Sequence, residues 1–159
     1  MKLKLVTILS IGLLVLLINC SHKIENKEIN SAEVVVQVKK QVKAFHAADT
    51  ALNAQGVIDL LWPEYTMLVD GKYIDYEEVI TGSISFMASL DVFHTEWKEL
   101  RIIPIGNSHA ISSFIFTDSI VAKDGTITQS RGPNTFVWEK RDGVWKVIFG
   151  DADHYPIKQ

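Results

Sequence analysis

The chain has 159 residues, of which 47% are hydrophobic and 22% are charged, and its formal net charge is −3 at pH 7. A mildly acidic chain lacks the basic surface that binds nucleic acid, so we expect no nucleic-acid partner. The length suits one domain with a core and a pocket, and it excludes a second domain of ordinary size.

An apolar run from Leu5 to Ile18 follows a basic start at the N-terminus. The run has the length of a signal peptide and is shorter than the roughly 20 residues that span a membrane. It ends at Leu17-Ile18-Asn19-Cys20, which resembles the lipobox of bacterial lipoproteins, although a smaller residue than Asn19 is usual before the cysteine. We therefore predict a signal peptide over residues 1–19. An uncleaved N-terminal membrane anchor is the alternative.

Cys20 is the only cysteine, so a disulfide within the chain is excluded. Acylation explains a lone cysteine in an exported protein, since each buried CH₂ contributes about 0.8 kcal/mol to membrane binding. We predict lipidation of Cys20, a flexible tether over residues 20–32 and a domain over 33–159. The expected location is the bacterial cell envelope, facing the periplasm or the exterior, with membrane contact through the lipid only.

Three helices are predicted in the first half of the domain. Asn30 and Glu33 form a capped start for a long helix that ends near Leu52. Its apolar residues recur at three- and four-residue steps, at Val35, Val38, Val42, Phe45 and Leu52. A short helix is expected over Gln55–Leu61, ending near Trp62-Pro63, and Asp75 with Glu78 caps a third helix.

Strands make up most of the remaining chain. A short hairpin is predicted from Tyr65–Val69, an Asp70-Gly71 turn and a return strand over 72–74. Long strands follow over residues 92–105, 109–121, 126–140 and 144–151, and Gly132-Pro133 suggests a bulge or an edge in the third of these. Helices followed by antiparallel strands predict an α+β fold, with helices covering one face of a curved sheet.

The closing hairpin, Thr135–Phe149, is apolar on both faces around an Asp-Gly turn. If Lys140 pairs with Val144, alternation divides the apolar residues between two faces. One face then carries Val137, Trp145, Val147 and Phe149, and the other carries Phe136, Trp138 and Ile148. A sheet that is apolar on both sides must be covered on both, so we expect a pocket or helices on one face and a partner on the other.

Residues 33–154 resemble the SnoaL-like branch of the nuclear transport factor 2-like superfamily. Four pieces carry the resemblance in order: the helix Val38–Ala51, the segment Leu60–Thr66, the turn Val69–Lys72, and the closing hairpin with its Gly-x-Trp-Lys end. The resemblance implies a cone in which a bent antiparallel sheet wraps the long helix and leaves an apolar pocket. It also implies a homodimer through the outer sheet face. The superfamily includes isomerases, dehydratases, hydrolases and binding modules, so the fold alone does not fix the activity.

Candidates for chemistry are few. Many relatives carry a histidine on the final strand, where this chain has Phe149 or Asp151. By alternation Asp151 shares a face with Phe149, and at the rim of an apolar pocket it would be a usable general base. His46 and His94 are its candidate partners. Asp49 and Asp118 have no acidic or basic partner at a meaningful spacing, and His154 is placed in a structural tail.

Two functions stay open at this stage. The first is a binding domain without catalysis, which holds a small apolar ligand and requires a cavity of at least about 300 Å³. Its predicted ligand-binding residues are Phe45, Trp62, Tyr65, Phe86, Trp97 and Phe149. The second is a pocket enzyme of isomerase, dehydratase or hydrolase type, with Asp151 as the base and His46 or His94 as its partner. The dispersed histidines predict no metal site, and no motif predicts a cofactor.

Overall fold

Three helices and seven strands follow one another in a computed structural model that describes residues 30–158. The helices are α2 (Ser31–Thr50), α3 (Ala54–Ile58) and α4 (Tyr76–Ala88). The strands are β1 (Leu61–Val69), β2 (Lys72–Ile74), β3 (Leu90–Ile105), β4 (His109–Ala122), β5 (Ile127–Arg141), β6 (Val144–Ala152) and β7 (Tyr155–Pro156). This arrangement confirms the predicted α+β class.

The predicted signal peptide and lipidation site fall in residues 1–29, outside the described part of the chain. Their assignments remain predictions. Within residues 30–158, no helix has the length and apolar character needed to cross a membrane.

Helix α2 begins where the sequence predicts. The Asn30 side chain accepts a hydrogen bond from the Glu33 backbone N–H at 3.2 Å, which satisfies a free donor of the first turn. The buried face of the helix consists of Val34, Val38, Val42, Phe45 and Ala48. The predicted stripe is confirmed in its centre, and Val34 takes the buried position that was assigned to Val35.

The two shorter helices match the predictions to different degrees. Helix α4 begins with the predicted capping box, because Asp75 and Glu78 each bond the other's backbone N–H. Helix α3 ends at Ile58, earlier than predicted, because β1 already begins at Leu61. Pro63 is tolerated in β1 because the pairing of β1 with β6 is irregular between Leu61 and Thr66.

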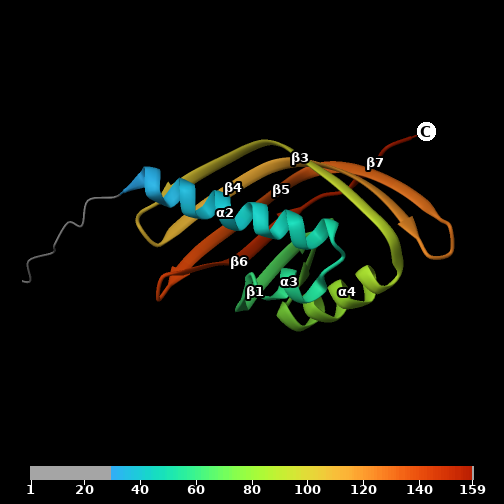
Figure 1. Ribbon diagram of the computed structural model, residues 1–159, viewed down its shortest axis with the longest axis horizontal. Coiled ribbons are helices and arrows are strands. Elements are labelled where there is room, and N and C mark those ends of the chain that lie inside the picture. Colours follow the sequence, from blue (N-terminus) through green and yellow to red (C-terminus); the bar gives the residue numbers. More distant parts are fainter. Residues whose placement is uncertain (1–29, 159) are drawn as a thin grey trace, which may run out of the picture.

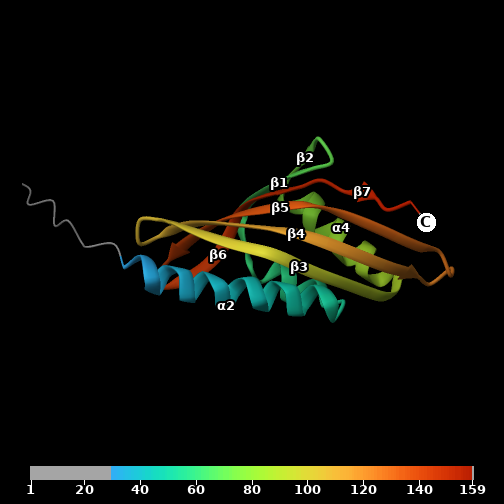
Figure 2. The ribbon, with the colours of Figure 1, turned by 90° about the horizontal axis from the view of Figure 1, so that it is seen from above.

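The strands form one curved sheet in the order β2-β1-β6-β5-β4-β3. All pairings are antiparallel except that of β1 with β6, which is parallel, so the sheet is mixed. Helix α2 lies along one face of the sheet, while α3 and α4 close the end of the fold next to β1 (Figure 1). The view from above shows α2 running beside β3 and the small β1–β2 hairpin projecting at the far edge (Figure 2).

The closing hairpin has a different register from the one predicted. Asp142 and Gly143 form a two-residue turn with φ values of 50° and 84°, so Arg141, not Lys140, pairs with Val144. A bulge then places Ile148 between the pairs Trp138–Val147 and Val137–Phe149. The alternation of β6 therefore reverses after Val147.

The shifted turn register and the bulge together overturn the predicted faces of the hairpin. Trp138 is 0% exposed, and its indole N–H donates to the Ser112 hydroxyl at 2.8 Å inside the core. Phe136, Trp145 and Val147 are buried with it. The prediction that Phe136 and Trp138 lie on the opposite face from Trp145 and Val147 is therefore wrong, since all four side chains are buried on the helix-covered face.

The Gly132-Pro133 pair does not interrupt β5. It lies where β6 ends and the chain turns into β7, which pairs with β5 at Ser130 and Arg131. A Cβ on Gly132 would overlap the backbone carbonyl of Asp153. Glycine is therefore required at this point for the C-terminal segment to cross β5.

An apolar band crosses the opposite face of the sheet. Ile103, Ile111, Val137 and Phe149 lie side by side on β3, β4, β5 and β6, because each is the register partner of the next. Ile103 is 56% exposed and the neighbouring Ile105 is 51% exposed. We refer to Ile103, Ile111, Val137 and Phe149 as the outer apolar band.

Candidate functional site

A cavity of about 220 Å³ lies between α2, α4 and the inner face of the sheet. Four of the six predicted ligand-binding residues line it, namely Phe45, Tyr65, Phe86 and Trp97. The remaining wall is mostly apolar and comes from Val57, Leu61, Met67, Val79, Met87, Phe93, Phe114, Phe116, Phe136 and Ala152. The volume is below the roughly 300 Å³ that the sequence analysis required, so the expected cavity size was wrong.

Stacked rings form one wall of the cavity. Trp97 lies parallel to Phe114 with ring centroids 4.1 Å apart, and Phe45 contacts Phe136 at 4.8 Å. The Trp97 indole N–H donates to the Thr95 hydroxyl at 3.0 Å. These contacts fix the rings, so a ligand would meet a preformed aromatic surface.

The polar side chains of the cavity come from distant parts of the sequence. Asp49 lies at the end of α2, Tyr65 on β1, Asp118 on β4 and Asn134 on β5. Asp118 is 7% exposed and Asn134 is 9% exposed. One carboxylate oxygen of Asp118 and the amide oxygen of Asn134 are buried without a partner among the described residues.

Both acids have raised pKa values, and the Asp118 carboxyl contributes to the rise at Asp49. Burial, reinforced by the nearby Asp118 carboxyl, raises the pKa of Asp49 from its ordinary value of 3.8 to about 8. Burial also raises the pKa of Asp118, against the opposing effects of a hydrogen bond with the Thr95 side chain and of the His154 ring. Burial and the Asp49 charge raise the pKa of Tyr65, which keeps its hydroxyl protonated.

His154 lies at the rim of the cavity. Its backbone N–H donates to the Asp70 carboxylate at 2.7 Å, and its ring nitrogen lies 3.2 Å from the same group. The imidazole ring packs on Phe116 with centroids 4.9 Å apart. The C-terminal segment therefore contributes a side chain to the cavity in addition to its structural role.

Asp151, the predicted base, does not line the cavity. Its neighbour Ala152 does, and Gly150 packs against the Tyr65 hydroxyl, so alternation directs Asp151 to the other face. The bulge at Ile148 is the physical reason, because it reverses the alternation from which the prediction was made. Phe149 is moved to the outer face by the same reversal.

The two predicted histidines lie away from the cavity. The ring of His46 contacts Trp97 edge-on, and its Nε2 bonds the Thr95 carbonyl at 3.0 Å. It lines a separate surface depression with Lys43 and Leu100. His94 is exposed on β3 opposite Ser119. Neither histidine converges on Asp151.

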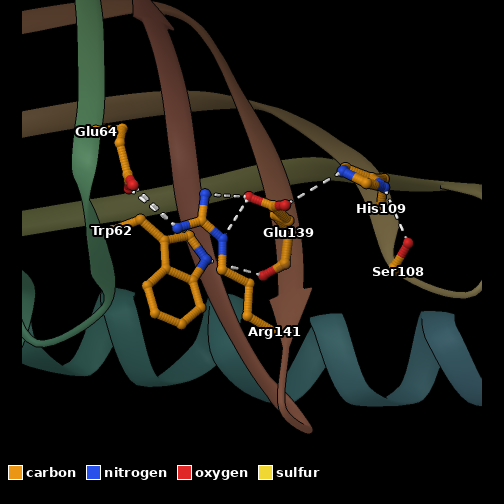
Figure 3. A network of polar contacts seen from close by, with 6 residues as sticks. All are labelled: Trp62, Glu64, Ser108, His109, Glu139 and Arg141. Carbon is orange, nitrogen blue, oxygen red and sulfur yellow. Dashed lines mark hydrogen bonds and ion pairs between the residues drawn. The ribbon is translucent and has the colours of Figure 1, made fainter.

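Trp62 belongs to a surface network instead of the pocket. Its indole N–H donates to the Glu139 carbonyl at 3.1 Å, and the Arg141 guanidinium lies 4.7 Å above its ring (Figure 3). Arg141 also forms ion pairs with Glu139 at 2.6 Å and Glu64 at 3.1 Å. The network covers an aromatic side chain at the sheet surface, and such exposed ion pairs contribute little stability.

The sequence did contain signals for the residues that were missed. Asp118 alternates with Phe114 and Phe116 on a strand, which places it on their inward face. Asp49 follows Val42 and Phe45 at helical spacing, so it extends the buried stripe. Among residues 30–158 no group of three or more potential ligands is arranged to hold a metal ion.

Comparisons with solved structures support the fold. A Xanthomonas campestris protein assigned as a calcium/calmodulin dependent protein kinase II association domain is 22% identical, with a TM-score of 0.64 over 75% of this chain and 86% of that one. A nuclear transport factor 2-like protein from Salmonella enterica is 14% identical, with a TM-score of 0.70 over 80% of this chain and 94% of that one. A protein assigned as a dehydratase of that family, from Streptomyces avermitilis, is 16% identical, with a TM-score of 0.67 over 79% of this chain and 99% of that one.

These matches confirm the nuclear transport factor 2-like cone that the sequence resemblance implied. No functionally curated protein gives a match. The family model for the calcium/calmodulin dependent protein kinase II association domain matches residues 65–152, which is more than half of the chain. The chain therefore belongs to the calcium/calmodulin dependent protein kinase II association domain family.

Proposed function

We propose that this domain binds a small molecule in its cone cavity. The observation that supports the proposal most directly is the pair of partnerless oxygens of Asp118 and Asn134 in an otherwise apolar cavity. Each unsatisfied buried group costs about 1–3 kcal/mol. Most buried polar groups in proteins have a partner, so two exceptions in one cavity favour a site that a ligand completes.

The cavity volume narrows the ligand class. A cavity of about 150 Å³ holds one benzene molecule, and drug-sized ligands occupy about 300 Å³ or more. The 220 Å³ of this cavity therefore suit one ring with a short substituent. The stacked Trp97 and Phe114 favour a flat or aromatic body.

Filling the cavity tests this proposal. Ser83 lines the cavity from α4, whereas Ser85 is exposed on the same helix. We expect wild-type protein to bind single-ring fragments in ligand-observed NMR, and S83W to lose at least about tenfold in affinity because the indole occupies the ligand space. S85W is the matched control and should bind like wild type. Equal binding by all three proteins would place the ligand elsewhere, and no binding would refute the proposal.

A second candidate function is acid–base catalysis in the same cavity. The observation that favours it is the raised pKa of Asp49, which at about 8 is close to the optimum for a general base at neutral pH. Asp49 thereby takes the role that the sequence assigned to Asp151. Catalysis would be supported if the wild type converts a bound compound and D49N does not. Recovery of the same compound from both proteins would leave simple binding.

We further propose that two copies pair through the outer apolar band. The support is the continuous apolar row of Ile103, Ile111, Val137 and Phe149 across four strands. I103E should shift a dimer to monomer in sedimentation velocity, because it buries a charge at the interface. Val36, 68% exposed on α2, provides the control V36E, which should leave the dimer intact. A wild-type monomer at high concentration would contradict the pairing.

We also propose that the protein is exported and anchored to the membrane by a lipid on Cys20. The support is the apolar run Leu5–Ile18 followed by Cys20. Mass spectrometry of the protein from bacterial membranes should show a chain that begins at Cys20 and carries acyl groups. Replacing Cys20 with serine should release the domain from the membrane. An unmodified Met1 in the membrane fraction would contradict the proposed processing.

A further inference from the structure

The polar side of the cavity is acidic and offers mainly acceptors. One carboxylate oxygen of Asp118 and the amide oxygen of Asn134 have no donor within residues 30–158. The Thr95 hydroxyl is already engaged, since it accepts from Trp97 and bonds Asp118. The free acceptors therefore call for a ligand that brings N–H or O–H donors.

The charges of the cavity have one predominant sign. Its titratable side chains are Asp49 on α2, Tyr65 on β1, Asp118 on β4 and His154 after β6, and no lysine or arginine is among the described residues that line it. His154 is at the rim, where the Asp70 carboxylate pairs with it. An anionic ligand would thus meet two acids without a fixed countercharge.

We propose that the ligand is a small organic cation, an amine or amidine on an aromatic or flat apolar body, whose charged nitrogen lies between Asp49 and Asp118. This inference rests on the proposed binding function and specifies its substrate class. Asp49 and Asp118 both line the cavity, and the Asp118 carboxyl lies close enough to act on the ionisation of Asp49. The two carboxyl groups therefore provide the local countercharge that an ammonium group requires. The ring stack of Trp97 and Phe114 accommodates the apolar body.

Asn134 defines the other end of the site. It lies on the inner face of β5 opposite Phe114, whereas Asp118 lies four residues further along β4. The backbone positions of the two residues are thus about 13 Å apart along the strand, and the concave curvature of the sheet brings their side chains closer together. A hydroxyl or amide at the far end of the ligand would satisfy Asn134 while the cation pairs with Asp118.

Three compounds of similar shape test whether the charge of the ligand determines binding. Phenethylamine, 2-phenylethanol and phenylacetate share a body and differ in the charge of the polar end. Titration calorimetry with wild-type protein at pH 8 should show phenethylamine binding at least about tenfold tighter than the other two. D118N should lose this preference. D91N changes an exposed acid of β3 that does not line the cavity, and it should retain the preference.

Proton release provides an independent readout. A cation requires ionised Asp49, so binding below pH 8 should release up to one proton, seen as a dependence of the heat on buffer ionisation enthalpy. Affinity should fall about tenfold or more from pH 8 to pH 6, and D49N should abolish the release. A merely structural Asp49 would give no release in wild type.

Failure of this inference is distinguishable from failure of the binding function. If 2-phenylethanol or phenylacetate binds as tightly as phenethylamine, or if D118N keeps the amine preference, the cation assignment is overturned and the binding function stands. If none of the three compounds binds and single-ring fragments also fail to bind, the binding function itself is refuted.

Discussion

Replacing Asp49 with asparagine is expected to stabilise the folded domain at pH 9 by about 2–4 kcal/mol and to change its stability little at pH 4. Asparagine has nearly the shape of a protonated aspartate and cannot ionise. The full rise in pKa from 3.8 to about 8 corresponds to roughly 5–6 kcal/mol. We expect less because water that enters the cavity screens the charge.

The direction of this change in stability with pH follows from the number of protons that the folded and unfolded states bind. The folded domain holds the Asp49 proton up to about pH 8, whereas the unfolded chain loses it near pH 4. Between these values the folded state binds more protons, so its stability decreases as the pH rises through this window. Asp118, whose pKa is also raised, acts in the same direction.

Urea unfolding of wild type, D49N and D91N at pH 4, 6, 8 and 9 measures the effect. The advantage of D49N over wild type should grow through the window and level off above pH 8, while D91N should track wild type. An equal difference at all pH values would mean that Asp49 is not protonated in the fold.

Replacing Trp138 with alanine is expected to lower the free energy of unfolding by about 3–5 kcal/mol, which is a large fraction of the stability of an ordinary domain. The indole is fully buried, and its loss would leave a cavity and remove the donor to Ser112. W138F is the milder test, since it keeps most of the apolar contacts but deprives Ser112 of its donor. It should cost about 1–3 kcal/mol.

Trp62 is the matched control for this prediction. It is partly buried at the surface under Arg141, so W62A should cost only about 1 kcal/mol. Urea unfolding of W138F and W62A avoids the risk that W138A does not fold. If W138F cost nothing, the buried position of Trp138 and its hydrogen bond to Ser112 would be contradicted.

The elements that local chemistry determines could be predicted from the sequence. The Asn30 cap, the Asp75–Glu78 capping box and the Asp142-Gly143 turn each depend on side chains a few residues apart. The apolar stripe of α2 likewise identified the helix face that the sheet covers. Four cavity residues followed from this reading of the fold, because large rings on the inward face of a cone line its interior.

The residues of the candidate site could not be predicted in the same way, because their positions depend on features that no short stretch of sequence marks. A bulge at Ile148 is one extra residue, which no nearby residue type marks, yet it moves Asp151 and Phe149 out of the interior. Asp49 and Asp118 line the same cavity although they lie far apart in the sequence. The two acids look isolated in the sequence because no partner lies near either of them there, yet the fold brings them to one cavity.

Native mass spectrometry of the protein purified from its own host tests the central claim most directly. Wild type should carry one small molecule per chain, of a size consistent with a single substituted ring, and collisional activation should release it as a cation. S83W prepared in parallel should carry none, and S85W should match wild type. Wild type without a bound molecule, or S83W with the same adduct, would contradict a ligand-binding role for the cone cavity.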